Sequence, residues 1–454
     1  MDFTRPLQHA IAVVDRWLEY NVATDPRLPG LSVGIIHHDR ILFSKGYGYA
    51  DLERHVRANA TTCYRIASFS KIFTTVALLQ LVEQGKLDLD TPVQHYLPWF
   101  ASPADPHLDS ITCRQLVTHT AGLDRDGERA QWLDFQFPVL EQIQAHIVEG
   151  ATVYAPADRW KYSNYGFTIL GEVIHQVSGM PYEEYVTRNV VERLGLELTG
   201  PTLTEPIRAH LATGYSRSFP HQAKEPFPHI ETNAMASATG FSSNVVDLCR
   251  FMAAQFPGNT QLLQDKTKEA MRTIHSPKTD TSSAWGLGLS SWEVDERRLY
   301  GHSGGFPGFI SRFGFDPERE IGVVVLVNAI DAPSSALVDN IWKCIHYFVK
   351  HADDFALEAP VSENFASGVG LYRNIWDDIE LIALDNQPAF YSPGPEAPSE
   401  SLYQLRYEKD DHYRMVAGSG SGHVGEILRF VRENGAVKKI VVGSDPFERV
   451  AAQA

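Results

Sequence analysis

The distribution of apolar and polar positions divides the chain into a long α/β part followed by a shorter β-rich part. The first predicted element is an amphipathic helix, with apolar residues at helical spacing at Leu7, Ile11, Val14 and Leu18. Two β-rich runs follow, residues 31–37 and 40–47, and their separation by His38-Asp39 predicts a hairpin. Residues 66–84 then form a strongly apolar helical stretch. The pattern therefore predicts an antiparallel sheet and a buried helix early in the chain.

The middle of the chain is predicted to be mostly helical, and strand patterns return near residue 285. Helices are expected near residues 111–118, 138–149, 164–178, 181–194, 244–255 and 262–273. Strands are expected at residues 285–292, 298–302, 309–315 and 321–327, followed by a closing helix at residues 334–350. A sheet begun by the first 65 residues and completed after residue 285 predicts an α/β sandwich, an antiparallel sheet between helices, with an inserted α-helical subdomain.

Beyond His351 the pattern changes to an acidic linker and then to short β runs. These runs are residues 379–384, 402–408, 412–416, 427–432 and 437–442. We therefore expect a domain at 1–350, with its α/β part at about 1–65 and 285–350 and its α subdomain at about 85–280. A linker at 351–360 and a small β domain at 361–454, for which a barrel is one candidate architecture, complete the expected organisation.

Composition and charge narrow the classes of partner. The 454 residues include 40 Lys and Arg against 56 Asp and Glu, a formal charge of −16, with no basic cluster. Nucleic acid and anionic membranes are therefore not expected as partners. The charged residues of the first helix argue against a signal peptide, and no stretch approaches the roughly 18 uncharged apolar residues of a membrane span. A cytoplasmic protein is the resulting expectation.

Metal and organic cofactors are not expected from the motifs. The four cysteines, at positions 63, 113, 249 and 344, are widely spaced and predict buried free thiols. The 18 histidines include no His-x-x-x-His or His-Glu-x-x-His pair on a predicted helix. A glycine-rich phosphate loop before a helix is also missing from the sequence.

Ser68 and Lys71 form the chain's only Ser-x-x-Lys motif. The spacing places Lys71 one helical turn beyond Ser68 on the same face of the apolar helix. A lysine on a helix is often a solvated surface residue, but Lys71 is the only charged residue between Ile66 and Val82. Because burial lowers the pKa of a lysine, Lys71 is a candidate base for a Ser68 nucleophile.

Tyr162 and Asn164 lie just before a predicted helix, in the sequence Tyr162-Ser163-Asn164. Asn164 could simply be a helix cap, and Tyr162 a packed ring. In the functional interpretation, the Tyr162 phenol moves a proton near Lys71, and the Asn164 amide orients the lysine or a substrate carbonyl.

The sequence Gly301-His302-Ser303-Gly304-Gly305 has two functional interpretations. As His-x-Gly it would end a strand that lines a cleft, with Gly304 and Gly305 allowing a substrate to approach the backbone. As Gly-x-Ser-x-Gly it would be the nucleophile elbow of an α/β-hydrolase, with Ser303 attacking. The elbow requires a helix directly after the serine, whereas Pro307 and a strand-like alternation follow here. His302 could also be an ordinary hydrogen-bonded loop residue.

Four segments together resemble the serine β-lactamase and penicillin-binding-protein superfamily, and its class C-like branch in particular. They are Tyr64-Arg65-Ile66-Ala67-Ser68-Phe69-Ser70-Lys71, Leu116-Val117-Thr118-His119-Thr120-Ala121-Gly122-Leu123, Tyr162-Ser163-Asn164-Tyr165-Gly166 and Gly301-His302-Ser303-Gly304-Gly305, in the order found in that family. The resemblance covers about residues 8–350, and this branch includes D-aminopeptidases, carboxylesterases and acyltransferases. The C-terminal domain resembles the β-barrel-like extensions of some D-aminopeptidase relatives only in size and strand content.

The resemblance implies a role for each matching residue. Ser68 corresponds to the acylated nucleophile, Lys71 to its base partner, Tyr162 to the proton shuttle and Asn164 to the orienting amide. The third motif corresponds to His302, Ser303 and Gly304, and the Gly305 amide would join that of Ser68 in the oxyanion hole. Penicillin-recognising relatives usually have Lys-Thr-Gly in the third motif, where this chain has His-Ser-Gly.

We therefore expect a serine hydrolase that forms an acyl-enzyme with esters or amides, such as a carboxylesterase or a D-aminopeptidase-like enzyme. Its expected partners are small-molecule esters, amides or short peptides. The alternatives are a β-lactamase or acyltransferase using the same site, an α/β-hydrolase using Ser303, and a catalytically silent binding protein on this fold.

Overall fold

The computed structural model describes residues 3–275, 284–355, 363–385, 387–418 and 423–451, which belong to two compact units. One unit is Pro26–Val338, and the other combines Met1–Asp25 with Asp339–Ala454. This division differs from the domain boundary expected at residue 350. The first helix, α1 (Thr4–Thr24), is grouped with the C-terminal strands because its side chains hydrogen-bond to them. Half of the expected linker, residues 356–360, lies outside the described part of the chain.

The unit Pro26–Val338 is built on an antiparallel sheet. Among the described residues this sheet has eight strands, in the order β3-β2-β1-β10-β9-β8-β7-β6. The strands are β1 (Gly30–His37), β2 (Arg40–Asp51), β3 (Val56–Arg57), β6 (Ala284–Trp285), β7 (Ser290–Val294), β8 (Arg297–Phe306), β9 (Phe309–Asp316) and β10 (Ile321–Val327). Leu31 lies opposite Val327, so the early hairpin pairs directly with the last strand of the unit. The predicted α/β class, with a sheet formed by distant parts of the chain, is confirmed.

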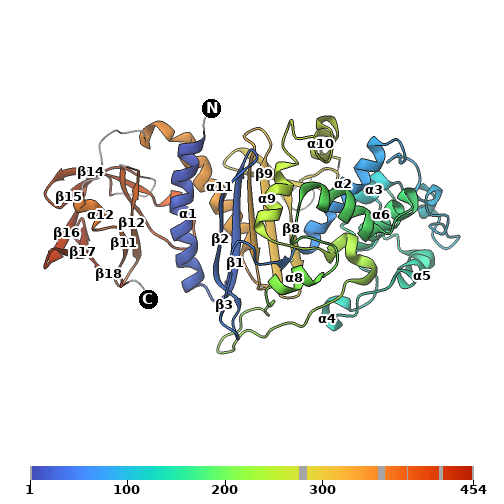
Figure 1. Ribbon diagram of the computed structural model, residues 1–454, viewed down its shortest axis with the longest axis horizontal. Coiled ribbons are helices and arrows are strands. Elements are labelled where there is room, and N and C mark those ends of the chain that lie inside the picture. The colour runs from blue at the N-terminus through green and yellow to red at the C-terminus, as the bar shows by residue number, and fades with distance from the viewer. Residues whose placement is uncertain (1–2, 276–283, 356–362, 386, 419–422, 452–454) are drawn as a thin grey trace. The chain divides into compact units, whose positions relative to one another are not determined.

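The helices of this unit lie on one side of its sheet (Figure 1), and α9 packs against β1 and β10. They are α2 (Ser70–Glu83), α3 (Cys113–Val117), α4 (Gln131–Asp134), α5 (Leu140–Gly150), α6 (Asn164–Ser178), α7 (Tyr182–Val186), α8 (Glu205–His210), α9 (Val245–Ala253) and α10 (Asp265–Arg272). A short two-stranded sheet joins β4 (Tyr64–Arg65) to β5 (Ser242–Ser243). Every residue of α2 from Ser70 to Leu81 is buried, as expected for a helix that is apolar on all sides.

Some predicted elements are divided in the structure. The helix expected from residue 66 begins only at Ser70, after a 3₁₀ turn at Ala67–Phe69, because Ala67 has a left-handed φ of 51°. The strand expected at residues 285–292 is interrupted between β6 and β7, where Gly288 has a φ of 66°. The helix expected at 181–194 is α7 followed by a π turn and a 3₁₀ turn.

The second unit contains a closed antiparallel barrel, which in the described residues has eight strands. They are β11 (Gly370–Arg373), β12 (Asp378–Leu384), β13 (Gln387–Tyr391), β14 (Tyr403–Lys409), β15 (His412–Gly418), β16 (Ile427–Glu433), β17 (Ala436–Val442) and β18 (Asp445–Arg449). Alternate side chains fill its interior, Leu381, Leu428 and Ile440 among them. The helices α11 (Ser334–Lys350) and α12 (Glu363–Ala366) precede the strands. The expected C-terminal β domain is confirmed, and the barrel is its architecture.

Contacts between α1 and the barrel explain why both ends of the chain belong to one unit. Arg16 donates a 2.8 Å hydrogen bond to Glu380, and the Tyr20 hydroxyl donates one of 2.8 Å to Asp378. The Trp17 indole N–H donates to the carbonyl of Gly394 at 2.8 Å. These partners lie more than 350 positions apart, a separation that the local sequence pattern does not reveal.

All four cysteines are buried and free, as predicted. Burial raises the pKa of Cys63 and of Cys113 to about 12, so both thiols are protonated at neutral pH. No helix in the described ranges is long and apolar enough to cross a membrane.

Candidate active site

Ser68 lies in the 3₁₀ turn Ala67–Phe69, directly before helix α2. The turn is held from two sides. The carbonyl of Ile66 accepts a 2.9 Å hydrogen bond from the Ser311 hydroxyl of β9, and the Ile66 N–H donates to Phe241 at 3.0 Å. Ala67, next to the predicted nucleophile, has a left-handed φ of 51°, and such backbone strain is common in active sites.

Lys71 is fully buried in the first turn of α2, and its ammonium nitrogen faces three oxygen atoms. Lys71 Nζ lies 2.7 Å from Asn164 Oδ1, 2.8 Å from the carbonyl oxygen of Ala238 and 3.2 Å from Ser68 Oγ. The amide and carbonyl oxygens can only accept hydrogen bonds, so a neutral lysine uses its two protons on them. Its lone pair is then left for the Ser68 hydroxyl. The predicted base and nucleophile are thus brought together.

Burial also lowers the pKa of Lys71 well below its usual value. The Asp126 carboxylate opposes this shift, and the nearby positive charge of Arg125 adds to it. Burial is the largest cause, which favours a lysine that can be neutral and accept a proton near neutral pH.

Asn164 is the first residue of α6, but the cap of that helix is Ser163. The Ser163 hydroxyl accepts a 2.8 Å hydrogen bond from the Gly166 N–H. The Asn164 side chain is therefore free for other partners, and it joins Lys71 to Asp126, whose carboxylate accepts from Asn164 Nδ2 at 2.7 Å. The interpretation of Asn164 as a simple cap is wrong.

Tyr162 lies against the same lysine. Lys71 Nζ is 5.0 Å from the centroid of its ring, and the His119 ring is 4.3 Å from it, centroid to centroid. Desolvation raises the pKa of the Tyr162 phenol above its usual value, and a hydrogen bond with Ser68 lowers it in part. The phenol is thus a protonated group beside both Ser68 and Lys71 at neutral pH.

His302 is buried in β8 and is neutral. Burial lowers its pKa to about 3, and the positive charge of Lys71 adds to this effect. Its Nδ1 donates to the carbonyl of Ser303 at 2.5 Å, and within the described residues Nε2 has no hydrogen-bond partner. The ring lies 5.4 Å from that of Trp285, in an aromatic wall that includes Tyr162. His302 therefore supplies no cation to the third motif.

A glycine of the third motif lets β8 approach the 3₁₀ turn Ala67–Phe69, which contains Ser68. A side chain on Gly304 would place its Cβ 2.2 Å from the carbonyl oxygen of Ile66, so only glycine fits there. The alternate positions of the strand, Ser303 and Gly305, are exposed. Ser303 lies inside β8, which turns directly into strand β9, so the nucleophile-elbow interpretation is wrong.

Three residues of the site were not predicted from the sequence. His119, quoted within the second motif but given no role, has a left-handed φ of 60°, and its Nδ1 accepts a 3.2 Å hydrogen bond from the Ser163 N–H. Burial lowers its pKa well below the usual value, so it is neutral. Arg125 and Asp126 lie in the loop before α4. Their only sequence signal is their position a few residues after the second motif.

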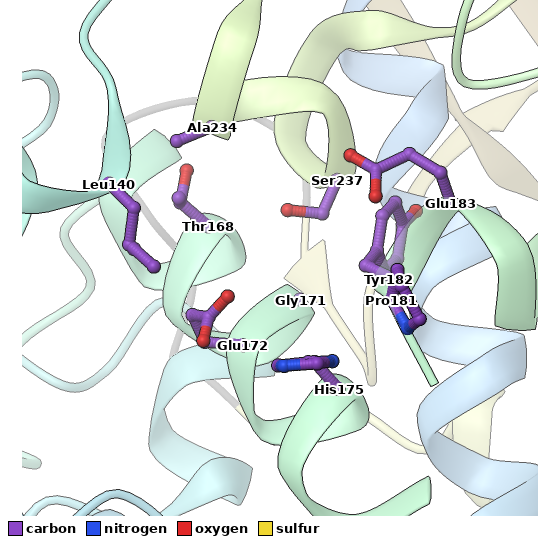
Figure 2. Close-up of a pocket in the computed structure, with 10 residues that line it drawn as sticks. All are labelled: Leu140, Thr168, Gly171, Glu172, His175, Pro181, Tyr182, Glu183, Ala234 and Ser237. Atoms are coloured by element: carbon purple, nitrogen blue, oxygen red, sulfur yellow. The ribbon is translucent and has the colours of Figure 1, made fainter. Parts of the chain in front are cut away.

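A separate cavity lies beside α6, and Figure 2 shows the side chains around it. It is lined by Leu140, Thr168, Gly171, Glu172, His175, Pro181, Tyr182, Glu183, Ala234 and Ser237. The predicted site residues are not among its lining. Burial raises the pKa of Glu172 there. Thr74 of α2 hydrogen-bonds to two of the lining residues, the Tyr182 hydroxyl and the Ser237 carbonyl, at 2.7 Å each.

Comparison with known proteins gives a consistent picture. Residues 14–342 match the Beta-lactamase family. Protein flp of Staphylococcus aureus (strain N315) is 27% identical over 318 residues, 69% of this chain and 62% of flp, so the chain spans less than two thirds of that relative.

Solved structures extend the comparison. The octameric penicillin-binding protein homologue from Pyrococcus abyssi has a TM-score of 0.64 at 22% identity and covers 96% of this chain and 98% of its own. A D-stereospecific amidohydrolase from Streptomyces sp. (TM-score 0.61, 25% identity) covers 72% of this chain and 96% of its own. The hydrolase EstCE1, described as having promiscuous acyltransferase activity, covers 75% and 98% (TM-score 0.62, 24% identity).

Proposed function

Because the chain belongs to the Beta-lactamase family, within the serine β-lactamase and penicillin-binding-protein superfamily, we propose that it is a serine hydrolase that forms an acyl-enzyme on Ser68. The observation that carries this proposal is the environment of Lys71 Nζ. Two neighbours, Asn164 Oδ1 and the Ala238 carbonyl, can only accept hydrogen bonds, so the lone pair of a neutral lysine faces Ser68 Oγ.

Acylation follows from this arrangement. Lys71 takes the hydroxyl proton of Ser68 while Ser68 Oγ attacks the substrate carbonyl carbon. The backbone N–H groups of Ser68 and Gly305 donate to the resulting oxyanion, as the family resemblance implies. The proton passes through the Tyr162 phenol to the leaving alcohol or amine, whose bond to the carbonyl carbon breaks. Water then gives a proton to the Lys71–Tyr162 pair as its oxygen attacks the acyl carbon. The bond from that carbon to Ser68 Oγ breaks, Ser68 Oγ takes the proton from the pair, and the acid is released.

We propose esters or amides without a carboxylate beside the scissile bond as the substrates. His302 occupies the third-motif position where penicillin-recognising relatives usually have a lysine, and burial keeps it neutral. A substrate carboxylate would therefore lack a cationic partner there. The similarity to EstCE1 and to a D-stereospecific amidohydrolase supports an ester or a D-amino acid amide as the first test substrate.

The substrate class is tested by comparing kcat/KM for a short-chain aryl ester, a D-amino acid amide and a cephalosporin. We expect higher values for the ester or the amide, and His302→Lys should shift the ratio toward the cephalosporin. Efficient cephalosporin hydrolysis with little ester or amide turnover would instead identify a β-lactamase. Transfer of the acyl group to an added alcohol in preference to water would identify an acyltransferase.

The nucleophile is tested by fluorophosphonate labelling followed by peptide mapping. We expect the label on Ser68, and we expect Ser68→Ala to abolish it. Ser303→Ala is the matched control, a serine of the third motif, and should keep the label. A label on Ser303 that survives Ser68→Ala contradicts the mechanism. Absence of any label and of any turnover would leave the fold with a binding function only.

A further inference from the structure

The adjacent residues Arg125 and Asp126 contact two of the side chains that surround Ser68 and Lys71. Asp126 Oδ1 accepts a 2.7 Å hydrogen bond from Asn164 Nδ2, while the guanidinium carbon of Arg125 lies 5.6 Å from the centroid of the Tyr162 ring. Arg125 and Asp126 are themselves paired, with Arg125 Nε 3.0 Å from Asp126 Oδ2. The Arg125 carbonyl also accepts a hydrogen bond from the Asn164 backbone N–H at 2.8 Å. Arg125 and Asp126 therefore hold both the backbone and the side chain of Asn164 in place.

The contact with Asp126 decides which way the Asn164 amide faces. A carboxylate can only accept hydrogen bonds, so it must face the NH₂ group of the amide, which leaves the oxygen for Lys71. With the amide turned over, its oxygen would face the Asp126 carboxylate, which is a repulsive contact. Its NH₂ would face Lys71 and occupy the lone pair that a neutral lysine needs for Ser68. Asn164 can therefore accept from Lys71 because Asp126 fixes its orientation.

We propose that Arg125 and Asp126 act as a positioning pair, in which Asp126 orients the Asn164 amide toward Lys71 and Arg125 balances the charge that Asp126 brings to the site. The inference rests on the function proposed above. The balance matters because Asp126 alone would stabilise the protonated lysine, whereas a base must release its proton.

The charges near Lys71 act in opposite directions. Asp126 raises the pKa of Lys71 and Arg125 lowers it. The other titratable groups around the lysine are Tyr162, which is protonated, and the histidines His119 and His302, which are neutral. Asp126 and Arg125 are therefore the two charged side chains that act on the pKa of Lys71 in opposite directions. Removing either one should shift that pKa.

The test is the pH dependence of kcat/KM for an aryl ester in two single variants. Asp126→Asn keeps an amide oxygen that can accept from Asn164, but it removes the negative charge. The acid limb of the profile, where Lys71 loses its proton, should move to lower pH by about one unit. Arg125→Gln should move the limb to higher pH by a smaller amount, because the Arg125 side chain is 62% exposed.

A third variant isolates orientation from charge. Asp126→Ala removes the acceptor for Asn164 Nδ2, so kcat should fall by about 10–100-fold even at the best pH. Asp158→Asn and Arg159→Gln are matched controls, because this neighbouring pair joins Arg159 Nε to Asp158 Oδ2 at 2.8 Å and is exposed. Neither control should move the profile.

The outcomes separate this inference from the proposed function. The unmodified protein must first hydrolyse the ester and be labelled on Ser68. An acid limb that does not move in Asp126→Asn and Arg125→Gln then shows that the charge balance is wrong. An unchanged kcat in Asp126→Ala shows that the orienting role is wrong, and in both cases the proposed function stands. A uniform loss of activity at every pH, with a lower melting temperature, would also overturn the positioning role, because a structural role gives that result. An unlabelled, inactive unmodified protein would instead contradict the proposed function itself.

Discussion

At the scale of the residue, Lys71 supports the most direct prediction. Lys71→Arg keeps the positive charge but cannot give up its proton, because the pKa of a guanidinium is above 12. We expect kcat/KM to fall by about 10²–10⁴-fold, the usual contribution of a general base. Steady-state kinetics and the rate of fluorophosphonate labelling measure this loss. Turnover near that of the unmodified protein would show that Lys71 has only a structural role.

His302 predicts how stability depends on pH. Its pKa is lowered to about 3 in the folded protein, whereas an unfolded histidine takes up a proton near pH 6.5. Between these values the unfolded state binds the extra proton, so stability falls as the pH decreases below about 6.5. The slope contributed by one such histidine approaches ~1.4 kcal/mol per pH unit.

Urea unfolding at pH 7 and pH 5 measures this dependence. The variant His302→Gln, which cannot titrate, should lose less stability between the two pH values than the unmodified protein. His210→Gln is a control on an exposed histidine of the same unit, and it should leave the difference unchanged. An equal pH dependence in the unmodified protein and in His302→Gln would contradict the prediction.

The residues of the site differ in how far the sequence could predict them. Ser68 and Lys71 are three positions apart, so helix geometry alone relates them. Asn164 and Asp126 are 38 positions apart, and their contact depends on the path of a loop that no local pattern describes. The neutral state of His302 depends on burial by distant elements, which again requires the three-dimensional structure.

At the scale of the element, strand β8 lies close to the 3₁₀ turn Ala67–Phe69, and Gly304 allows this approach. Gly304→Ala would place a methyl group 2.2 Å from the Ile66 carbonyl oxygen and 3.0 Å from Ala67 Cβ. We expect it to lower the free energy of unfolding by about 1–3 kcal/mol and to reduce ester turnover. In Gly305→Ala the nearest neighbour is Ile310 Cδ1 at 3.4 Å, so its melting temperature should be unchanged. Equal melting temperatures for both variants would contradict the prediction.

Elements with a strong apolar period were predicted best. Helix α6 and strand β10 have the predicted bounds, because each is buried along its whole length or on a regular face. The strands β13 and β18 were missed, since each contains a proline and β18 is mostly exposed. Closure of a barrel depends on such strands, and a polar strand has little signal in one sequence.

At the scale of the whole molecule, cutting the chain after residue 350 tests whether residues 1–350, which include Ser68 and Lys71, fold without the barrel. The domain boundaries remain a prediction. We expect fragment 1–350 to be soluble and labelled on Ser68, because the sheet from β3 to β6 is complete in it. Its melting temperature should be lower than that of the full chain, since Arg16 and Tyr20 lose Glu380 and Asp378.

The fragment is compared with the full chain by size-exclusion chromatography, thermal unfolding and fluorophosphonate labelling. A full-chain variant, Arg16→Gln with Tyr20→Phe, removes the same two contacts while keeping the barrel, so it shows how much of the change comes from them. A fragment that only aggregates would show that residues 1–350 need the barrel in order to fold.

The division of the chain into units also constrains the order in which the protein forms during translation. The unit Pro26–Val338 is one continuous segment and can fold as soon as it leaves the ribosome. Helix α1 is made before that unit, yet its partners on β12 are made more than 350 residues after it. At roughly 5–20 residues per second, this amphipathic helix waits on the order of 20–70 s for them. Chaperones that bind exposed apolar helix faces therefore have their longest opportunity at α1.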